Sequence, residues 1–165
     1  MSAAALGAWP TEGTRPAPET SIIELCSVRV GGAHFGVPIR QIVEIVGATR
    51  TLPVPLAPAF VGGLAHYRGE VLTTVSMRRL LEMPVLSEPK EMLVLEGAGG
   101  CFGLEVDAIG EILAVPATVV ERMPSTLSES ATALFAGTCK LPGRLLVLLN
   151  PDELDPVRLS VAFGR

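Results

Sequence analysis

The two histidines of this sequence are its most obvious candidates for proton transfer or metal binding. His34 lies in the expected turn GGAH, and His66 lies two residues before Arg68. Neither belongs to an H-E-x-x-H motif, and the sequence has no G-x-S-x-G motif. A metal site needs three or four converging ligands, and no such ligands cluster around either residue. We therefore expect surface histidines, no metal site and no cofactor.

Three carboxylates, Glu105, Asp107 and Glu111, lie around the end of one expected strand. A hydrolytic pair is conceivable, because two carboxyl groups can divide the roles of general acid and general base. The alternating apolar residues at 102, 104 and 106 favour another interpretation, in which Glu105 and Asp107 share the solvent face of the strand. We therefore expect no catalytic residue and predict that the chain is not an enzyme.

The glycine-rich stretch GAGGCFG at 97–103 is the best candidate for a phosphate-binding loop. It lacks the G-x-G-x-x-G spacing, and no Lys-Ser or Lys-Thr pair follows it. It also joins two expected strands, whereas a phosphate loop opens a helix. We therefore interpret it as a hairpin.

The cysteines and the first residues indicate an intracellular protein. Cys26, Cys101 and Cys139 are far apart and lack zinc spacing, so we expect small core residues in a reducing cytoplasm. The start MSAAALGAWPTEG lacks the basic and apolar regions of a secretion signal. Trp9 within it is expected to be exposed or weakly docked.

The composition indicates a protein that works through its surface. Of 165 residues, 48% are hydrophobic and the mean hydropathy is +0.47, yet no apolar run approaches the roughly 18 residues of a membrane span. The net charge is −4 and basic residues are scattered, so we expect no nucleic-acid partner. The surplus of apolar residues is expected to form a core and a surface for partner proteins.

Short segments with a period of two and glycine-rich turns make up most of the sequence. The alternation from Val71 to Met77 indicates a strand, headed by Arg68 and Gly69. Other strands are expected at 22–30, 35–37, 92–96, 102–106, 109–115, 138–140 and 144–149. Helical turns are expected at 60–64, 77–83 and 128–135, and from the N-cap Asn150. Short strands with little helix between them favour β-barrels over βαβ units.

Short motifs follow one another in a specific order. In the first half these are VRVG at 28–31, FGVPI at 35–39, VEI at 43–45, LP at 52–53, PAFVGG at 58–63 and RG at 68–69. In the second half FGLEVD at 102–107, EI at 111–112 and LVLLN at 146–150 continue the series. Over about residues 22–155 this order resembles the CheW family of bacterial chemotaxis coupling proteins. His66 and Tyr67 stand where that family usually has Asn-Leu.

The resemblance implies a mostly β fold. Two SH3-like five-stranded β-barrel subdomains would share a hydrophobic core, accompanied by short helices. The CheW-like domain would span residues 21–155, with a crossing between the two halves near 83–91. Residues 1–20 would form a flexible N-terminal tail and residues 156–165 a C-terminal tail.

The resemblance also implies an adaptor that couples a chemoreceptor to a histidine kinase without catalysis. Its partners would be the cytoplasmic tip of a methyl-accepting chemoreceptor and a CheA-like kinase, bound through the kinase's own CheW-like domain. The protein would be cytoplasmic and peripheral to membrane receptor arrays, with no direct membrane insertion. One alternative is an adaptor of a pathway for pili or surface motility, and another is a small-ligand-binding regulatory β-barrel.

Eight residues match family positions at which contacts with receptor or kinase are expected. Arg68 and Glu44 are expected to lie near each other at a barrel edge that faces the receptor. The equally weighted alternative is that Arg68 only braces the turn, since its guanidinium can hold a carboxylate or carbonyl groups. Gly69 would be required by the backbone. The contact candidates are Ile42, Glu44, Gly63, Arg68, Gly69, Val71, Gly103 and Ile112, with core packing as the alternative for Ile42 and Val71.

Overall fold

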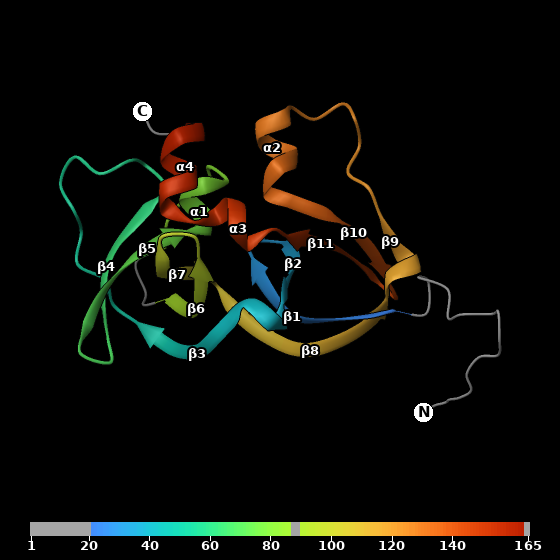
Figure 1. Ribbon diagram of the computed structural model, residues 1–165, viewed down its shortest axis with the longest axis horizontal. Coiled ribbons are helices and arrows are strands. Elements are labelled where there is room, and N and C mark those ends of the chain that lie inside the picture. Colours follow the sequence, from blue (N-terminus) through green and yellow to red (C-terminus); the bar gives the residue numbers. More distant parts are fainter. Residues whose placement is uncertain (1–20, 87–89, 164–165) are drawn as a thin grey trace.

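Two β-sheets organise the computed structural model, which describes residues 21–86 and 90–163 (Figure 1). The first sheet has six strands in the order β8-β1-β2-β11-β10-β9. These are β1 (Ile22–Val30), β2 (Ala33–Pro38), β8 (Ala108–Pro116), β9 (Val120–Glu121), β10 (Phe135–Leu141) and β11 (Arg144–Leu149). The sixth strand is the two-residue β9, which pairs with β10 and was not expected.

The second sheet has five strands in the order β3-β6-β7-β5-β4 and occupies the left side of Figure 1. These are β3 (Ile42–Thr49), β4 (Val61–Tyr67), β5 (Glu70–Ser76), β6 (Lys90–Gly97) and β7 (Gly100–Val106). In each sheet one pair of strands is parallel, β2 with β11 and β5 with β7, and the other pairs are antiparallel. The expected mostly β fold is confirmed.

The chain passes between the sheets at two places. The 3-10 turn η2 (Ile39–Gln41) leads from β2 to β3, and Asp107 separates β7 from β8. The expected crossing between the two halves near 83–91 is wrong, because this segment joins α1 to β6 and the strands before and after it, β5 and β6, belong to the same sheet. Residues 87–89 of this segment and the expected tail at 1–20 lie outside the described residues.

The described residues form three clusters of buried apolar side chains. The largest lies between the sheets and combines Val28 and Phe35 of the first sheet with Leu93 and Phe102 of the second and with Leu154 near the C-terminus. Smaller clusters belong to one sheet each. They are Leu25, Val115, Cys139, Leu146 and Leu148 in the first and Ala65, Leu72, Met92 and Val94 in the second. The two barrels therefore each have an interior and share a larger core, as expected.

The five-stranded sheet closes on itself just after β3. Leu52 and Leu64 exchange two backbone hydrogen bonds, with N–O distances of 2.9 and 2.8 Å, and so connect the chain beyond β3 to β4. A Cβ at Gly63 would lie 2.6 Å from the Leu52 carbonyl oxygen, so this close approach needs glycine. The expected helical turn at 60–64 is wrong, because this segment pairs with both β5 and Leu52.

Short helices cover one side of the sheets (Figure 1). They are α1 (Met77–Leu80), α2 (Glu129–Leu134), α3 (Pro151–Leu154) and α4 (Pro156–Phe163). The 3-10 turn η3 (Ala117–Val119) lies apart from them and connects β8 to β9. The expected C-terminal tail at 156–165 is wrong up to residue 163, because Leu159 of α4 is fully buried in the shared core. Pro151 opens α3 as expected, but the Asn150 side chain does not cap it and donates to the Ala133 carbonyl instead. None of the described helices is long and apolar enough to span a membrane.

Candidate functional site

Arg68 and Gly69 form the two-residue turn of the β4–β5 hairpin. Tyr67 pairs with Glu70 across the turn, and φ is 48° at Arg68 and 78° at Gly69. Two consecutive positive φ values are the signature of a type I′ turn, whose twist matches that of the flanking strands. Gly69 accepts this conformation without strain, whereas Arg68 does not. The strand expected at 71–77 is therefore the second half of a hairpin that holds Arg68 at its tip.

The Arg68 guanidinium lies on the Glu44 carboxylate, as expected. Its Nη2 and Nε atoms are 2.7 and 2.9 Å from Glu44 Oε1. The Tyr67 hydroxyl donates to the same oxygen at 2.6 Å, and Arg68 also lies over the Tyr67 ring. From the sequence, Tyr67 was known only as one of two residues that replace the usual Asn-Leu of the family. Its role as the third member of this cluster was not predicted.

The cluster changes the proton affinity of its members. The Tyr67 hydroxyl and then the Arg68 guanidinium stabilise the charged carboxylate, so the pKa of Glu44 lies below its usual range. The Glu44 carboxylate in turn raises the pKa of Tyr67, because ionisation of the phenol would remove the hydrogen bond that it donates. At neutral pH the cluster therefore holds one carboxylate, one phenol and one guanidinium.

The cluster also links the two edges of the five-stranded sheet. Glu44 belongs to β3 and Tyr67 to β4, and these strands stand at opposite ends of the strand order. The contact lies on the same seam as the backbone bridge between Leu52 and Leu64. Arg68 thus helps to hold β3 and β4 together, yet 71% of its side chain is exposed to solvent.

A shallow hollow surrounds this exposed guanidinium. It measures about 340 Å³ and is lined by Val43, Glu44, Tyr67, Arg68 and Glu70, which we call the Arg68 patch. Apolar side chains are exposed on the same sheet, with 50% of Val43, 47% of Ile45 and 64% of Val71 accessible. A charged centre with exposed aliphatic side chains nearby is suited to binding another protein.

The other expected contact residues differ in burial and do not all lie on the same sheet. Val71 is exposed, whereas Ile42 is partly buried and packs against the shared core. Gly103 is buried in β7 beside Met92. Ile112 is 54% exposed but lies on β8 of the six-stranded sheet, opposite Cys26 of β1. The structure therefore brings Glu44, Arg68 and Gly69 together, as the family resemblance implied, but not the full set of expected contact residues.

The carboxylates considered for catalysis have structural partners. Glu105 is buried and accepts a hydrogen bond from the Thr74 hydroxyl at 2.5 Å. Asp107 accepts from Arg78 at 2.8 and 2.7 Å and from the Gly31 amide at 2.7 Å. The expectation that Glu105 and Asp107 share a solvent face is wrong, because both carboxylates are enclosed. Glu111 is exposed and pairs with Arg144.

The remaining reactive side chains do not converge. His34 lies within β2 and not in the preceding turn, and His66 is exposed on β4. Cys26 and Cys139 are buried, which raises the pKa of both thiols, whereas Cys101 is exposed and was wrongly expected in the core. Among the described residues, no three His, Cys, Asp or Glu side chains are placed to bind a metal ion together.

Comparison with known proteins assigns the family. A family model described as the CheW-like domain matches residues 24–156. The chain belongs to the CheW family. The chemotaxis protein CheW of Rhizobium meliloti is 33% identical over 136 residues, which are 81% of this chain and 87% of that relative. Protein FrzA of Myxococcus xanthus is 28% identical over 112 residues, 67% of this chain and 69% of that protein.

A solved structure supports the same conclusion about the fold. The scaffolding protein TtCheW from Thermoanaerobacter tengcongensis aligns with a TM-score of 0.72 over 81% of this chain and 92% of that chain, at 18% sequence identity. The expected pair of SH3-like barrels is thereby confirmed, with six strands in one sheet and five in the other. As a CheW family member, the chain is a coupling adaptor of chemotaxis-type signalling, and the family is one of non-catalytic scaffold proteins.

Proposed function

We propose that this CheW-family chain couples a chemoreceptor to a CheA-like histidine kinase, and that the Arg68 patch is one of its contact surfaces. The observation that carries the proposal is the exposed ion pair of Arg68 and Glu44 on a barrel that also exposes Val43, Ile45 and Val71. Membership of the CheW family supports a receptor and a kinase as the two partners. The protein would act in the cytoplasm, beside membrane receptor arrays.

The mechanism follows from rigidity and from the number of binding surfaces. The two barrels share a core that includes Phe35 and Phe102, so surfaces on different barrels keep a fixed relative geometry. When a scaffold holds two partners, binding of the first raises the effective concentration of the second. Contacts of modest strength can then form a stable assembly in which receptor state changes kinase activity.

The experiment measures binding of the Arg68→Asn variant to purified kinase and to receptor fragments from the same cell. Asparagine keeps a turn residue suited to positive φ and removes the guanidinium. We expect roughly tenfold or greater weakening of binding to at least one partner, as for an interface hot spot. Lys140→Asn is the matched control, because Lys140 is an equally exposed cation on the other barrel.

Two outcomes would count against this proposal. If Arg68→Asn binds both partners as tightly as the parent chain, the Arg68 patch has only a bracing role. If the parent chain binds neither partner, the adaptor proposal itself is wrong for these proteins. A histidine kinase from a pathway for pili or surface motility is the second partner to test, because FrzA, a relative without the CheW name, is also similar to this chain.

A further inference from the structure

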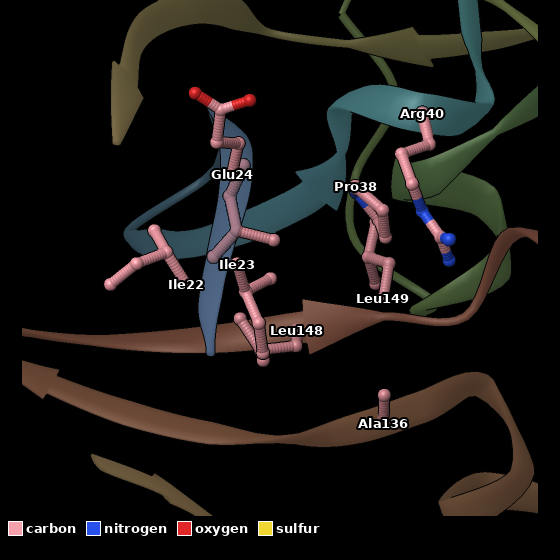
Figure 2. A pocket seen from close by; sticks show the side chains of 9 residues that line it. Ile22, Ile23, Glu24, Pro38, Arg40, Ala136, Leu148 and Leu149 are labelled. Atoms are coloured by element: carbon pink, nitrogen blue, oxygen red, sulfur yellow. The ribbon is translucent and has the colours of Figure 1, made fainter. Parts of the chain in front are cut away.

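A second hollow lies on the six-stranded barrel, away from the Arg68 patch. It has a volume of about 440 Å³ and is formed where the N-terminal end of β1 separates from β10 and β11. Figure 2 shows Ile23 on β1 directed towards Leu148 on β11, with Ala136 on β10 beyond, whereas the Glu24 carboxylate points away from Leu148. We call this hollow the β1–β11 groove.

The groove opens because the strand pairing around it stops. The pairing of β1 with β2 ends at Leu25 and Pro38, and the parallel pairing of β2 with β11 ends at Leu148. Beyond these positions Ile22 and Ile23 pair only with β8. The walls are mostly aliphatic, and 58% of the Ile22 side chain is exposed.

One charged residue of each sign borders the groove. Glu24 and Arg40 both line it and are both exposed, and neither forms an ion pair with another described residue. An apolar surface with an unpaired acid and an unpaired base fits a peptide that combines an apolar anchor with charges of both signs.

We propose that residues 1–20 of the same chain bind in the β1–β11 groove, with Trp9 as the inserted side chain. The described chain begins at Ser21, directly before the groove residue Ile22, so the preceding segment is tethered at the rim. Such a short tether gives an effective concentration on the order of millimolar, which is enough for a weak contact.

The composition of the segment matches the groove. Trp9 is the one tryptophan of the chain, and an indole provides a large apolar surface at little conformational cost. Glu12 and Arg15 follow it and supply charges opposite to Arg40 and Glu24. Twelve residue-to-residue steps lead from Trp9 to Ser21 (21 − 9), and about 3.3 Å per step gives ample length to return to the groove.

Trp9 fluorescence tests this proposal on the full chain. We expect a blue-shifted emission and an acrylamide quenching constant severalfold lower than that of a peptide of residues 1–20. Ala136→Glu places a carboxylate on the exposed groove wall and should restore peptide-like quenching. Ala48→Glu, at an exposed position on β3 of the other barrel, is the matched control and should leave quenching as in the parent.

Each remaining outcome has a definite meaning. Peptide-like quenching in the parent chain overturns the proposal, and so does an equal effect of Ala136→Glu and Ala48→Glu. Protection that disappears on dilution shows that the segment enters a second copy, which also overturns binding within one chain. Protection that is independent of protein concentration and is lost only in Ala136→Glu supports it. None of these results depends on receptor or kinase, so the adaptor function is tested separately.

Discussion

At the scale of single residues, Arg68 combines an unfavourable backbone with a favourable side chain. Its φ of 48° is strained for any residue with a Cβ, yet the guanidinium reaches both Glu44 and Tyr67 from this position. A hairpin with Asn-Gly at the same two positions would have no such strain. The contacts with Glu44 and Tyr67 offset a backbone strain that asparagine would avoid, and 71% of the Arg68 side chain stays exposed to a partner.

Two substitutions at Arg68 separate strain from side-chain contacts. Arg68→Ala and Arg68→Asn both remove the contacts with Glu44, but only alanine keeps the full strain of positive φ. We expect Arg68→Asn to melt roughly 2–4 °C above Arg68→Ala in thermal unfolding followed by circular dichroism. Equal melting temperatures would show that the turn tolerates any residue at this position.

The buried pair of Asp107 and Arg78 predicts a pH-dependent stability. Their side chains are 7% and 14% exposed, and Arg78, followed by the Gly31 amide, lowers the pKa of Asp107. A carboxyl group whose pKa is lowered by folding stabilises the fold above its unfolded pKa of about 3.9, and this stabilisation is lost as the pH falls towards the folded pKa. Asp107→Asn should therefore lower the free energy of unfolding by roughly 3 kcal/mol at pH 7.

The difference in free energy of unfolding between Asp107→Asn and the parent should narrow as the pH falls below about 4. The unfolded parent chain then takes up a proton at Asp107 that the folded chain takes up only at a lower pH, so the parent loses stability. Urea unfolding at pH 7, 5, 4 and 3 measures it. Glu111→Gln is the control, since the exposed pair of Glu111 with Arg144 should contribute little at any pH. A constant difference across this range would mean that the ionised carboxylate is not what stabilises the fold.

At the scale of elements, the loop between β3 and β4 presents an unusual residue. Leu56 has a φ of 66° and its side chain is fully exposed, so it has strain without packing to offset it. Leu56→Asn should relieve the strain and raise the free energy of unfolding by roughly 0.5–1 kcal/mol. Chemical denaturation of the purified variant measures this, and an unchanged or lower midpoint would contradict it.

Local sequence patterns predicted most elements because alternation and glycine turns are local properties. The hairpin at 97–103 and the strands from 92 to 115 needed only period-two spacing. The helical turn predicted at 60–64 was wrong because the two glycines of this segment weaken its local preference for helix or strand. Its pairing with Leu52 and β5 depends on residues outside the segment. The helix α4 was not predicted for a similar reason, since its stability depends on burying Leu159 in a core built from both sheets.

The candidate site was predicted only where matching to the family supplied long-range information. The contact of Glu44 with Arg68 was expected from family positions, whereas no spacing rule joins residues on two opposite edges of a sheet. Asp107 is a residue whose side-chain direction the alternation of the strand does not predict. It follows the last residue of β7, where the chain leaves the sheet, so its side chain turns inward to Arg78 and Gly31.

At the scale of the whole molecule, the two barrels are expected to unfold together. The largest apolar cluster joins both sheets and the C-terminal helices, and the smaller clusters hold four or five buried residues each. Leu154 is fully buried in the shared cluster, so Leu154→Ala should lower the free energy of unfolding by roughly 2–5 kcal/mol. Because neither barrel has a large core of its own, the loss should appear in one transition for both.

Coincidence of two probes tests this coupling. Cys101 on β7 is exposed and accepts a fluorescent label that reports on the five-stranded barrel, whereas far-ultraviolet circular dichroism reports on both. We expect the two denaturation curves to coincide in the parent and to move together in Leu154→Ala. If the label reports unfolding of its barrel while much of the far-ultraviolet circular dichroism of the β-strands remains, the two barrels unfold independently. Surfaces on different barrels would then lose the fixed geometry that a rigid coupling adaptor needs.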